Sequence, residues 1–274
     1  PPKERVEENL DSIKKYLRQR EDVEFFFLQE IDLKSKRSYD TPQFSSSWMD
    51  LHKYFYFYAI NYDVSYVPMP LSDPMGNVRA GLAITGDVCP LDCYRYSYPE
   101  NTSFFGWPVS IFMLDRCFLV SRYALDNGKE LVLINTHNSA FDEGGELRKK
   151  EVAFLRDFMV KEYEEKGNYV IAGGDFNQCP IGIEPQYVAD VYDSNDFVYM
   201  PDLLFPKEWN YVYDSTCPTN RNADVPYVRG ETKTSTIDFF IVSPNVEAKS
   251  VKTIDLQFEH SDHNPVEATF SLMN

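Results

Sequence analysis

The chain has 274 residues, of which 43% are hydrophobic and 26% are charged, so it can build a buried core and has an ordinary content of charge. The formal net charge of −16 argues against a protein that holds DNA or RNA through many phosphate contacts, because such proteins usually present a basic face. No apolar run approaches the roughly 18 residues needed to cross a bilayer, so we expect no transmembrane segment. The 5 cysteines are scattered without a CxxC pair, which disfavours a disulfide framework and a zinc site.

The N-terminal half opens with a predicted helix and strand. Apolar side chains recur at helical spacing over residues 4–19, which predicts an amphipathic helix. The run 23–28 predicts a buried strand. Serines at 45–47 are typical of a helix cap, and they predict a second helix that carries apolar residues up to Phe55.

Alternating strands and turns follow. Strands are predicted at 79–85, 111–124 and 130–136, and residues 126–128 (Asp-Asn-Gly) predict a hairpin turn between the last two. A long helix is expected over 145–165. Four more strands are predicted, at 168–173, 236–242, 246–258 and 264–270.

The organisation of these elements predicts one domain over residues 1–274. The chain shows no internal repeat and no low-complexity linker. Strands outnumber helices and several are adjacent in sequence, which favours mixed sheets with helices outside them over a strict βαβ repeat. The segment 180–233, rich in Pro, Asn, Asp and Tyr, is typical of long surface loops where substrate selection often resides.

Polar residues follow directly after several apolar strands. They are Glu30, His137, Asp175 with Asn177, Asp238, and the pair Asp262 and His263 near the C-terminus. A single carboxylate at a strand end is most often structural, so the recurrence carries the argument. If the carboxylates converge, each pair at about 4 Å repels by about 4 kcal/mol in a surface-like dielectric, which calls for a cation. Oxygen ligands of this kind suit Mg²⁺ or Mn²⁺ better than zinc.

Five short blocks resemble, in order, the signature blocks of the endonuclease/exonuclease/phosphatase superfamily, which includes pancreatic deoxyribonuclease and related metal-dependent phosphoesterases. The blocks are Leu28-Gln29-Glu30, Asn135-Thr136-His137, Gly174-Asp175-Phe176-Asn177, Ile237-Asp238 and Ser261-Asp262-His263-Asn264-Pro265-Val266. This resemblance implies an α/β fold of the α+β type, a four-layer α/β/β/α sandwich of two facing mixed β-sheets, with one active site at one end of the sheets.

The resemblance also implies roles for these residues. Glu30 would be a ligand of Mg²⁺ or Mn²⁺, and Asp262 would support the metal directly or through water. Asp175 would orient or deprotonate the attacking water, and Asn177 would contact the scissile phosphate.

The two histidines of the blocks would act on the phosphate. His263, steered by Asp238, would serve as a base or stabilise charge on the phosphoryl oxygens. His137 would donate a hydrogen bond to the phosphate. Two other histidines, His52 and His260, are expected to be structural.

Four further residues are candidates for the substrate phosphate. Arg116 resembles an arginine that touches phosphate in the deoxyribonuclease branch, and a surface ion pair is the alternative. Arg37, Asn220 and Arg221 are additional candidates for the substrate cleft.

The sequence departs from the family in one respect. Members begin with a strand that ends in a metal-binding Asn, whereas here the first helix begins near residue 4, so we expect the first N-terminal strand to be missing. This leaves two hypotheses open. The first is a divalent-metal-dependent hydrolase that cleaves phosphate esters, and the alternative is a non-catalytic descendant that binds a phosphorylated ligand or a protein.

The substrate stays open within the hydrolase hypothesis. A nucleic acid, a phospholipid head group or a small phosphoester each fits, as a diester or a monoester. The acidic balance predicts no stable nucleic-acid complex, and we expect a monomer. The compartment is open, and an upstream secretion signal would make the protein extracytoplasmic.

Overall fold

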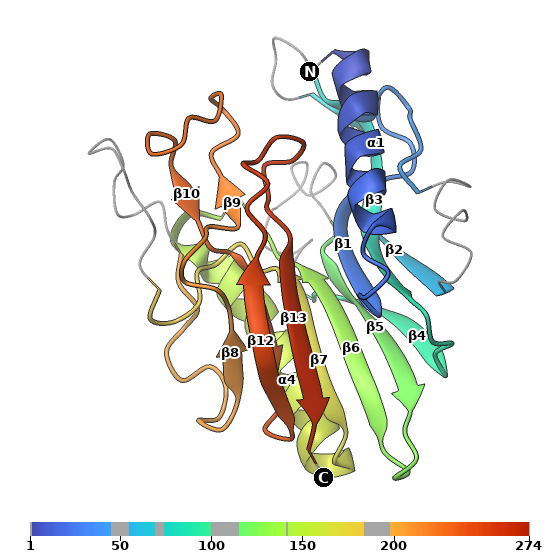
Figure 1. Ribbon diagram of the computed structural model, residues 1–274, viewed down its shortest axis with the longest axis vertical. Helices are drawn as coiled ribbons and strands as arrows, with labels where there is room; N and C mark the ends of the chain where they lie inside the picture. The colour runs from blue at the N-terminus through green and yellow to red at the C-terminus, as the bar shows by residue number, and fades with distance from the viewer. Residues whose placement is uncertain are drawn as a thin grey trace. The chain divides into compact units, whose positions relative to one another are not determined.

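The computed structural model describes residues 2–44, 55–68, 74–99, 115–140, 142–183 and 198–273 (Figure 1). It is a mixed α/β structure built mostly of strands, as predicted. The chain divides into two compact units. Unit 1 comprises Pro1–Tyr123 with Asn135–His137, and unit 2 comprises Ala124–Ile134 with Asn138–Asn274.

Unit 1 contains a helix and two sets of paired strands. Its three-stranded antiparallel sheet has the order β1-β3-β2, and β4 pairs with β5. The elements are α1 (Lys3–Arg18), β1 (Phe25–Asp32), the short 3₁₀ helix η1 (Lys36–Ser38), β2 (Phe55–Val67), β3 (Gly76–Gly86), β4 (Asp92–Ser97) and β5 (Cys117–Ala124).

The core of unit 1 forms around β3. Leu82 and Ile84 are fully buried among apolar side chains of β2 and β5. Gly81 is required here because a Cβ at this position would lie 2.1 Å from the carbonyl oxygen of Ala59. The backbones of β2 and β3 can therefore approach closely in the middle of the sheet.

Unit 2 contains the long helix and the remaining strands. Strands β7 and β8 flank β11 in antiparallel pairs, β9 pairs with β10, and β12 pairs with β13. The elements are β6 (Glu130–His137, whose last three residues belong to unit 1), η3 (Glu143–Gly145), α4 (Glu146–Lys166), β7 (Tyr169–Asp175), β8 (Asn210–Val212), β9 (Asn220–Arg221), β10 (Thr234–Ser235), β11 (Asp238–Val242), β12 (Val246–Thr253) and β13 (Val266–Leu272).

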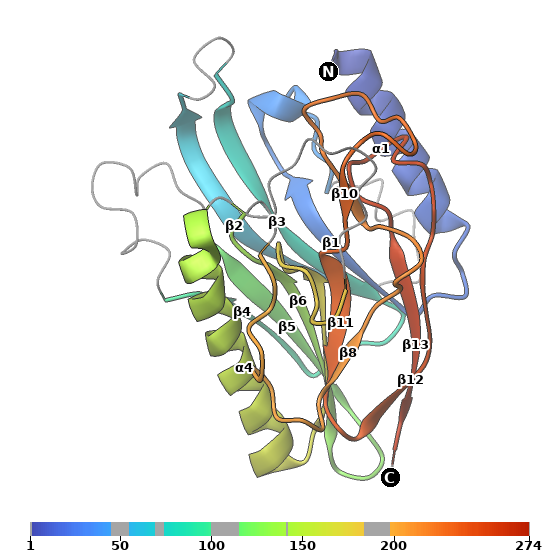
Figure 2. The ribbon, with the colours of Figure 1, turned by 90° about the vertical axis from the view of Figure 1, so that its left-hand side faces the viewer.

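Helix α4, the long green-to-yellow helix of Figure 2, packs against β7. Leu147, Leu155 and Met159 on one side of α4 are almost completely buried. Gly167 ends the helix at φ 68°, a left-handed conformation that favours glycine, and its N–H donates to the carbonyl of Tyr163. β7 follows at once, which fixes where the strand that carries Asp175 begins.

The two long helices and the main strands are confirmed, while other predictions need correction. Strand β12 ends at Thr253, not at 258, because Asp255 begins a loop whose backbone turns through positive φ at Gln257 and Phe258. Strands β2, β4 and β8–β10 were not predicted. The helix predicted over 45–55 falls mostly outside the described residues, as do 111–114 and His52, but Phe55 begins β2. None of the described helices combines the length and apolar character needed to cross a membrane.

Candidate active site

In unit 1, Glu30 lies on a bulge of β1. The register with β3 shifts between Leu28 and Ile31, and Glu30 has φ 54°, which turns its side chain away from the regular alternation. Asn135 holds this segment: its Nδ2 donates to the carbonyls of Leu28 and Ala83, both at 2.9 Å. The Leu28-Gln29-Glu30 and Asn135-Thr136-His137 blocks therefore form one hydrogen-bonded unit.

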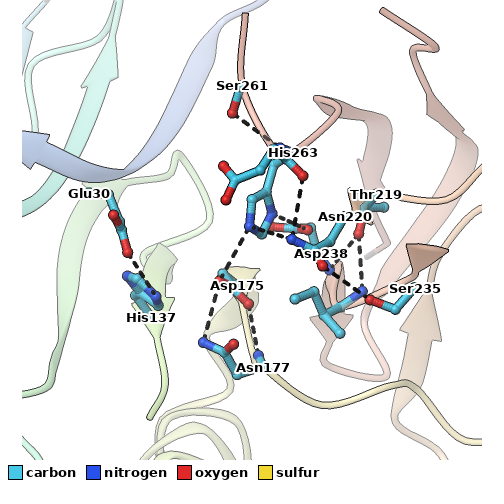
Figure 3. Close-up of polar contacts among 12 residues, drawn as sticks. Glu30, His137, Asp175, Asn177, Thr219, Asn220, Ser235, Asp238, Ser261 and His263 are labelled. Carbon is cyan, nitrogen blue, oxygen red and sulfur yellow. Dashed lines mark hydrogen bonds and ion pairs between the residues drawn. The ribbon is translucent and has the colours of Figure 1, made fainter. Parts of the chain in front are cut away.

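His137 faces Glu30 in the same unit (Figure 3). Its Nε2 lies 4.0 Å from Glu30 Oε1, and the imidazole is 3% exposed while Glu30 is 55% exposed. The hydroxyl groups of Thr136 and Tyr98, 2.8 Å apart, share a buried hydrogen bond that fixes the strand end. The buried imidazole is thus held beside an accessible carboxylate.

Arg37 contacts two carboxylates. Its Nε and Nη2 donate to the buried Asp32 at 2.9–3.2 Å, and its Nη1 donates to Glu30 Oε2 at 3.0 Å. Burial alone would lower the pKa of the guanidinium, but the charges of Glu30 and Asp32 and their hydrogen bonds raise it. Arg37 was predicted from the sequence to be a candidate contact for the substrate phosphate. In the structure its permanently charged guanidinium is hydrogen-bonded to the carboxylates of Asp32 and Glu30.

In unit 2, Asp175 and Asn177 form a tight polar loop after β7. The N–H of Asn177 donates to Asp175 Oδ1 at 2.8 Å, and its Nδ2 donates to the carbonyl of Asn138 at 2.8 Å. Phe176 between them is fully buried and stacks on Phe239, with ring centroids 4.3 Å apart. This buried ring anchors the loop, so the two polar side chains have fixed positions.

His263 lies between Asp238 and Asn220, as Figure 3 shows. Its Nδ1 is 2.8 Å from Asp238 Oδ2, and its Nε2 is 2.9 Å from Asn220 Nδ2 and 4.0 Å from Asp175 Oδ2. A neutral imidazole that donates from Nδ1 can accept a hydrogen bond from the Asn220 amide. A protonated imidazole would need the amide turned to present Oδ1.

The acidic neighbours favour the charged form of this imidazole. Burial would lower its pKa, but the charge and hydrogen bond of Asp238, followed by the charges of Asp175 and Asp262, raise the pKa of His263 to about 10. The cluster can therefore hold a positive charge in unit 2 at neutral pH in the metal-free protein.

We expect this charge to be visible in a titration of the metal-free protein. The folded-state pKa lies above the unfolded value of about 6.5, so the stabilisation is complete below that pH and is lost as pH rises through about 10. The His263 imidazole resonances should report the protonated form at pH 8 in excess chelator, and Asp238→Asn should lower the pKa. Deprotonation of wild-type His263 near pH 6.5 would contradict this expectation.

Arg148 opens a run of three basic residues, Arg148-Lys149-Lys150, yet its side chain is buried in this unit. Its Nε donates to the fully buried Asp142 at 2.5 Å, and its Nη1 donates to the carbonyl of Asn177 at 2.7 Å. Asp142 Oδ2 also accepts the N–H of Leu147 at the start of α4. The pair therefore links the helix start to the loop that carries Asn177.

Thr219 is a further supporting residue that the sequence analysis did not name. Its hydroxyl oxygen accepts the N–H groups of Ile237 and Asp238, at 3.0 and 3.1 Å, and so orients the start of β11. No local pattern marks such a threonine, because its partners lie 18 and 19 residues along the chain. It supports Asp238 without touching His263.

The remaining candidates have distinct surroundings. Arg116 is 4% exposed, which does not fit the alternative of a surface ion pair. The Arg221 guanidinium donates to the carbonyls of Asn222 and Val225 in its own loop. Asp262 is exposed beside His263, and its backbone carbonyl accepts the Arg221 N–H.

The described residues contain one grouping of side chains that could hold a metal ion, formed by Asp175, Asp238 and His263. Each offers one ligand atom, and these atoms lie within 4.8 Å of one another. The two carboxylates suit a hard divalent cation such as Mg²⁺ or Mn²⁺, whereas the imidazole is a ligand that softer divalent ions prefer.

The sequence profile of the Endonuclease/Exonuclease/phosphatase family matches residues 1–263. The chain belongs to this family. Members generally use divalent metals, which agrees with the acidic grouping. No curated protein matches the chain in sequence.

Solved structures of the endonuclease/exonuclease/phosphatase family share its fold. A member from Beutenbergia cavernae superposes with a TM-score of 0.66 at 16% identity, covering 96% of this chain and 66% of its own. A member from Bacteroides vulgatus superposes with a TM-score of 0.60 at 20% identity, covering 96% of this chain and 90% of its own. A mannosyl-6-phosphatase from Bacteroides thetaiotaomicron gives 0.61 at 16% identity, covering 97% and 92%. The chain thus spans just under two thirds of the first structure, and the predicted fold is confirmed.

Proposed function

We propose that this protein is a divalent-metal-dependent hydrolase that cleaves phosphate ester bonds. The observation that carries the proposal is the imidazole of His263, held through Nδ1 by Asp238 with Nε2 4.0 Å from Asp175. A carboxylate that fixes the tautomer and raises the pKa of an imidazole is a common arrangement for acid–base and electrostatic catalysis. Family membership favours phosphate esters as its substrates.

Under this proposal, three polar residues of unit 2 each have a separate role in hydrolysis. Asp175, 6% exposed and fixed by Asn177, orients the attacking water or accepts its proton. The Asn177 amide contacts the scissile phosphate. His263 in its charged form, which its acidic neighbours favour, stabilises negative charge on the phosphoryl oxygens, whereas the role of a base requires its neutral form.

In this proposal Glu30 of unit 1 is a cation ligand, and Asp262 of unit 2 supports a cation directly or through water; both are exposed carboxylates. Mg²⁺ or Mn²⁺ suits such oxygen donors. The bound ion supplies neutralisation of the anionic phosphate, which otherwise repels a nucleophile. In unit 1, the proposed role of His137 is to donate a hydrogen bond to the phosphate.

The substrate class is inferred from the fold neighbours and from the net charge of the chain. One fold neighbour is named a mannosyl-6-phosphatase and another a 2',3'-cyclic phosphatase, so both monoesters and cyclic diesters are reasonable probes. The net charge of −16 favours a small phosphoester or head group over a polyanion held through many contacts.

Removal of divalent ions should abolish hydrolysis. We expect no turnover of p-nitrophenyl phosphate, bis-p-nitrophenyl phosphate, sphingomyelin, inositol phosphates, DNA or RNA in excess chelator, and recovery for at least one of them when Mg²⁺ or Mn²⁺ is restored. Calcium supplied at the same ionic strength controls for salt effects. Full activity in chelator would exclude metal dependence, and binding without turnover across the panel would favour the non-catalytic alternative.

A further inference from the structure

Arg37 is mounted on a turn that is tied to the sheet of unit 1. The Ser35 hydroxyl accepts the N–H of Arg79 at 3.1 Å, and the neighbouring Lys36 ammonium donates to the carbonyl of Pro74 at 2.7 Å. Ser35 is fully buried. The backbone beneath Arg37 is therefore held from several directions, and its side chain starts from a fixed point.

The guanidinium of Arg37 is held by Asp32. This carboxylate is 2% exposed, accepts from both Nε and Nη2, and belongs to a strand segment whose N–H donates to Gln43 Oε1 at 2.9 Å. Leaving such a buried carboxylate without its cation is costly, so Arg37 is not expected to swing away. Asp32 accepts hydrogen bonds along the Nε–Nη2 edge of the guanidinium, and the remaining nitrogen, Nη1, donates to Glu30 Oε2 at 3.0 Å.

The charges in this trio oppose cation binding at Glu30. Two carboxylates and one guanidinium leave a net charge of −1, in place of the −2 that the two carboxylates would offer alone. A divalent cation bound to Glu30 would lie close to the positively charged guanidinium of Arg37. Because this region is partly buried, the Coulomb repulsion between the two positive charges is only weakly screened by water.

We propose that Arg37 is a resident counter-charge for Glu30: it holds this carboxylate in place in the absence of a metal and lowers its affinity for a divalent cation. The inference rests on the proposed role of Glu30 as a cation ligand. It makes Arg37 a positioning residue that sets the metal concentration at which the protein is loaded, and it assigns no substrate contact to Arg37.

Two variants should change cation affinity in opposite directions. Asp32→Asn removes a negative charge and leaves the guanidinium beside Glu30, so Mn²⁺ should bind several-fold more weakly. Asp32→Asn with Arg37→Gln restores the wild-type net charge of −1 but removes the guanidinium that contacts Glu30, so Mn²⁺ should bind a few-fold more tightly than to wild type. Calorimetric titration with Mn²⁺ alone measures both effects, and the Mn²⁺-induced rise in Tm checks them independently.

A single substitution keeps the test decisive if the double variant fails to fold. Arg37→Lys leaves a charge for Asp32 but shortens the reach toward Glu30, so Mn²⁺ affinity should rise by a few-fold. The matched control is Arg79→Lys, whose exposed ion pair with Asp63 lies in the same unit, and it should leave Mn²⁺ affinity unchanged.

The outcomes separate this inference from the proposed function. If wild type binds Mn²⁺ and hydrolyses a phosphate ester while all Arg37 variants bind Mn²⁺ with wild-type affinity, the inference is overturned and the function stands. An increase in KM alone would make Arg37 a phosphate contact and would also overturn it. If wild type shows neither Mn²⁺ binding nor hydrolysis, the proposed function falls as well.

Discussion

Replacing Asp175 by Asn should lower kcat for phosphate ester hydrolysis by about 10²- to 10⁴-fold while the protein stays folded. The amide has nearly the same shape, and its oxygen can still accept the N–H of Asn177, which bonds Asp175 Oδ1 at 2.8 Å. It cannot accept a proton from water, and it removes one of the negative charges near His263. Initial rates at saturating Mn²⁺, with circular dichroism to verify folding, measure the effect.

Asp224→Asn is the matched control, because Asp224 is exposed in the same unit. It makes the same change in charge and volume, and it should retain wild-type kcat. A fall in kcat of less than about threefold in Asp175→Asn would remove Asp175 from the proposed chemistry. A large fall in both variants would point to a general effect of net charge.

The largest stability effect is expected at Arg148. Replacement by Met should lower the free energy of unfolding by about 3–5 kcal/mol, because it leaves the carboxylate of Asp142 buried without its cation. Arg148 and Asp142 side chains are 9% and 0% exposed, and the guanidinium also bonds the Asn177 carbonyl. Chemical denaturation at pH 7 measures the change.

Lys149→Met provides the neighbouring comparison. Lys149 pairs with Glu146 on the exposed side of the same helix, with side chains 45% and 64% exposed, and such pairs contribute about 1 kcal/mol or less. Equal losses in the two variants would show that the buried link to Asp142 contributes little. Arg148→Lys, which keeps the charge near Asp142, should lose less stability than Arg148→Met.

The elements that the sequence predicted well have strong local signals. The helices at Lys3–Arg18 and Glu146–Lys166 show apolar spacing, and β7 is a short apolar run that ends in a glycine pair before Asp175. Glu30 and His137 were predicted as site residues because each follows an apolar strand. The structure adds that Asn135 bonds the strand backbone on which Glu30 is carried.

Features that depend on distant partners could not be read from the sequence. Arg148 stands in a run of three basic residues that carries no sign of burial, and only the fold brings it to Asp142 and to the Asn177 carbonyl. Thr219 supports Asp238 through backbone groups that are close only after β11 has formed. The positive φ of Glu30 arises from a register shift between β1 and β3, which no composition signals.

The route of the chain through β6 has a consequence for biosynthesis. Asn135–His137 are grouped with residues 1–123, although the preceding Ala124–Ile134 belong to the other unit. During synthesis, a nascent chain from which residue 135 has not yet emerged therefore lacks the Asn135 side-chain amide, which donates to the carbonyls of Leu28 and Ala83. A recombinant fragment that stops at residue 123 would have the same defect, so a split version of this protein needs its break elsewhere.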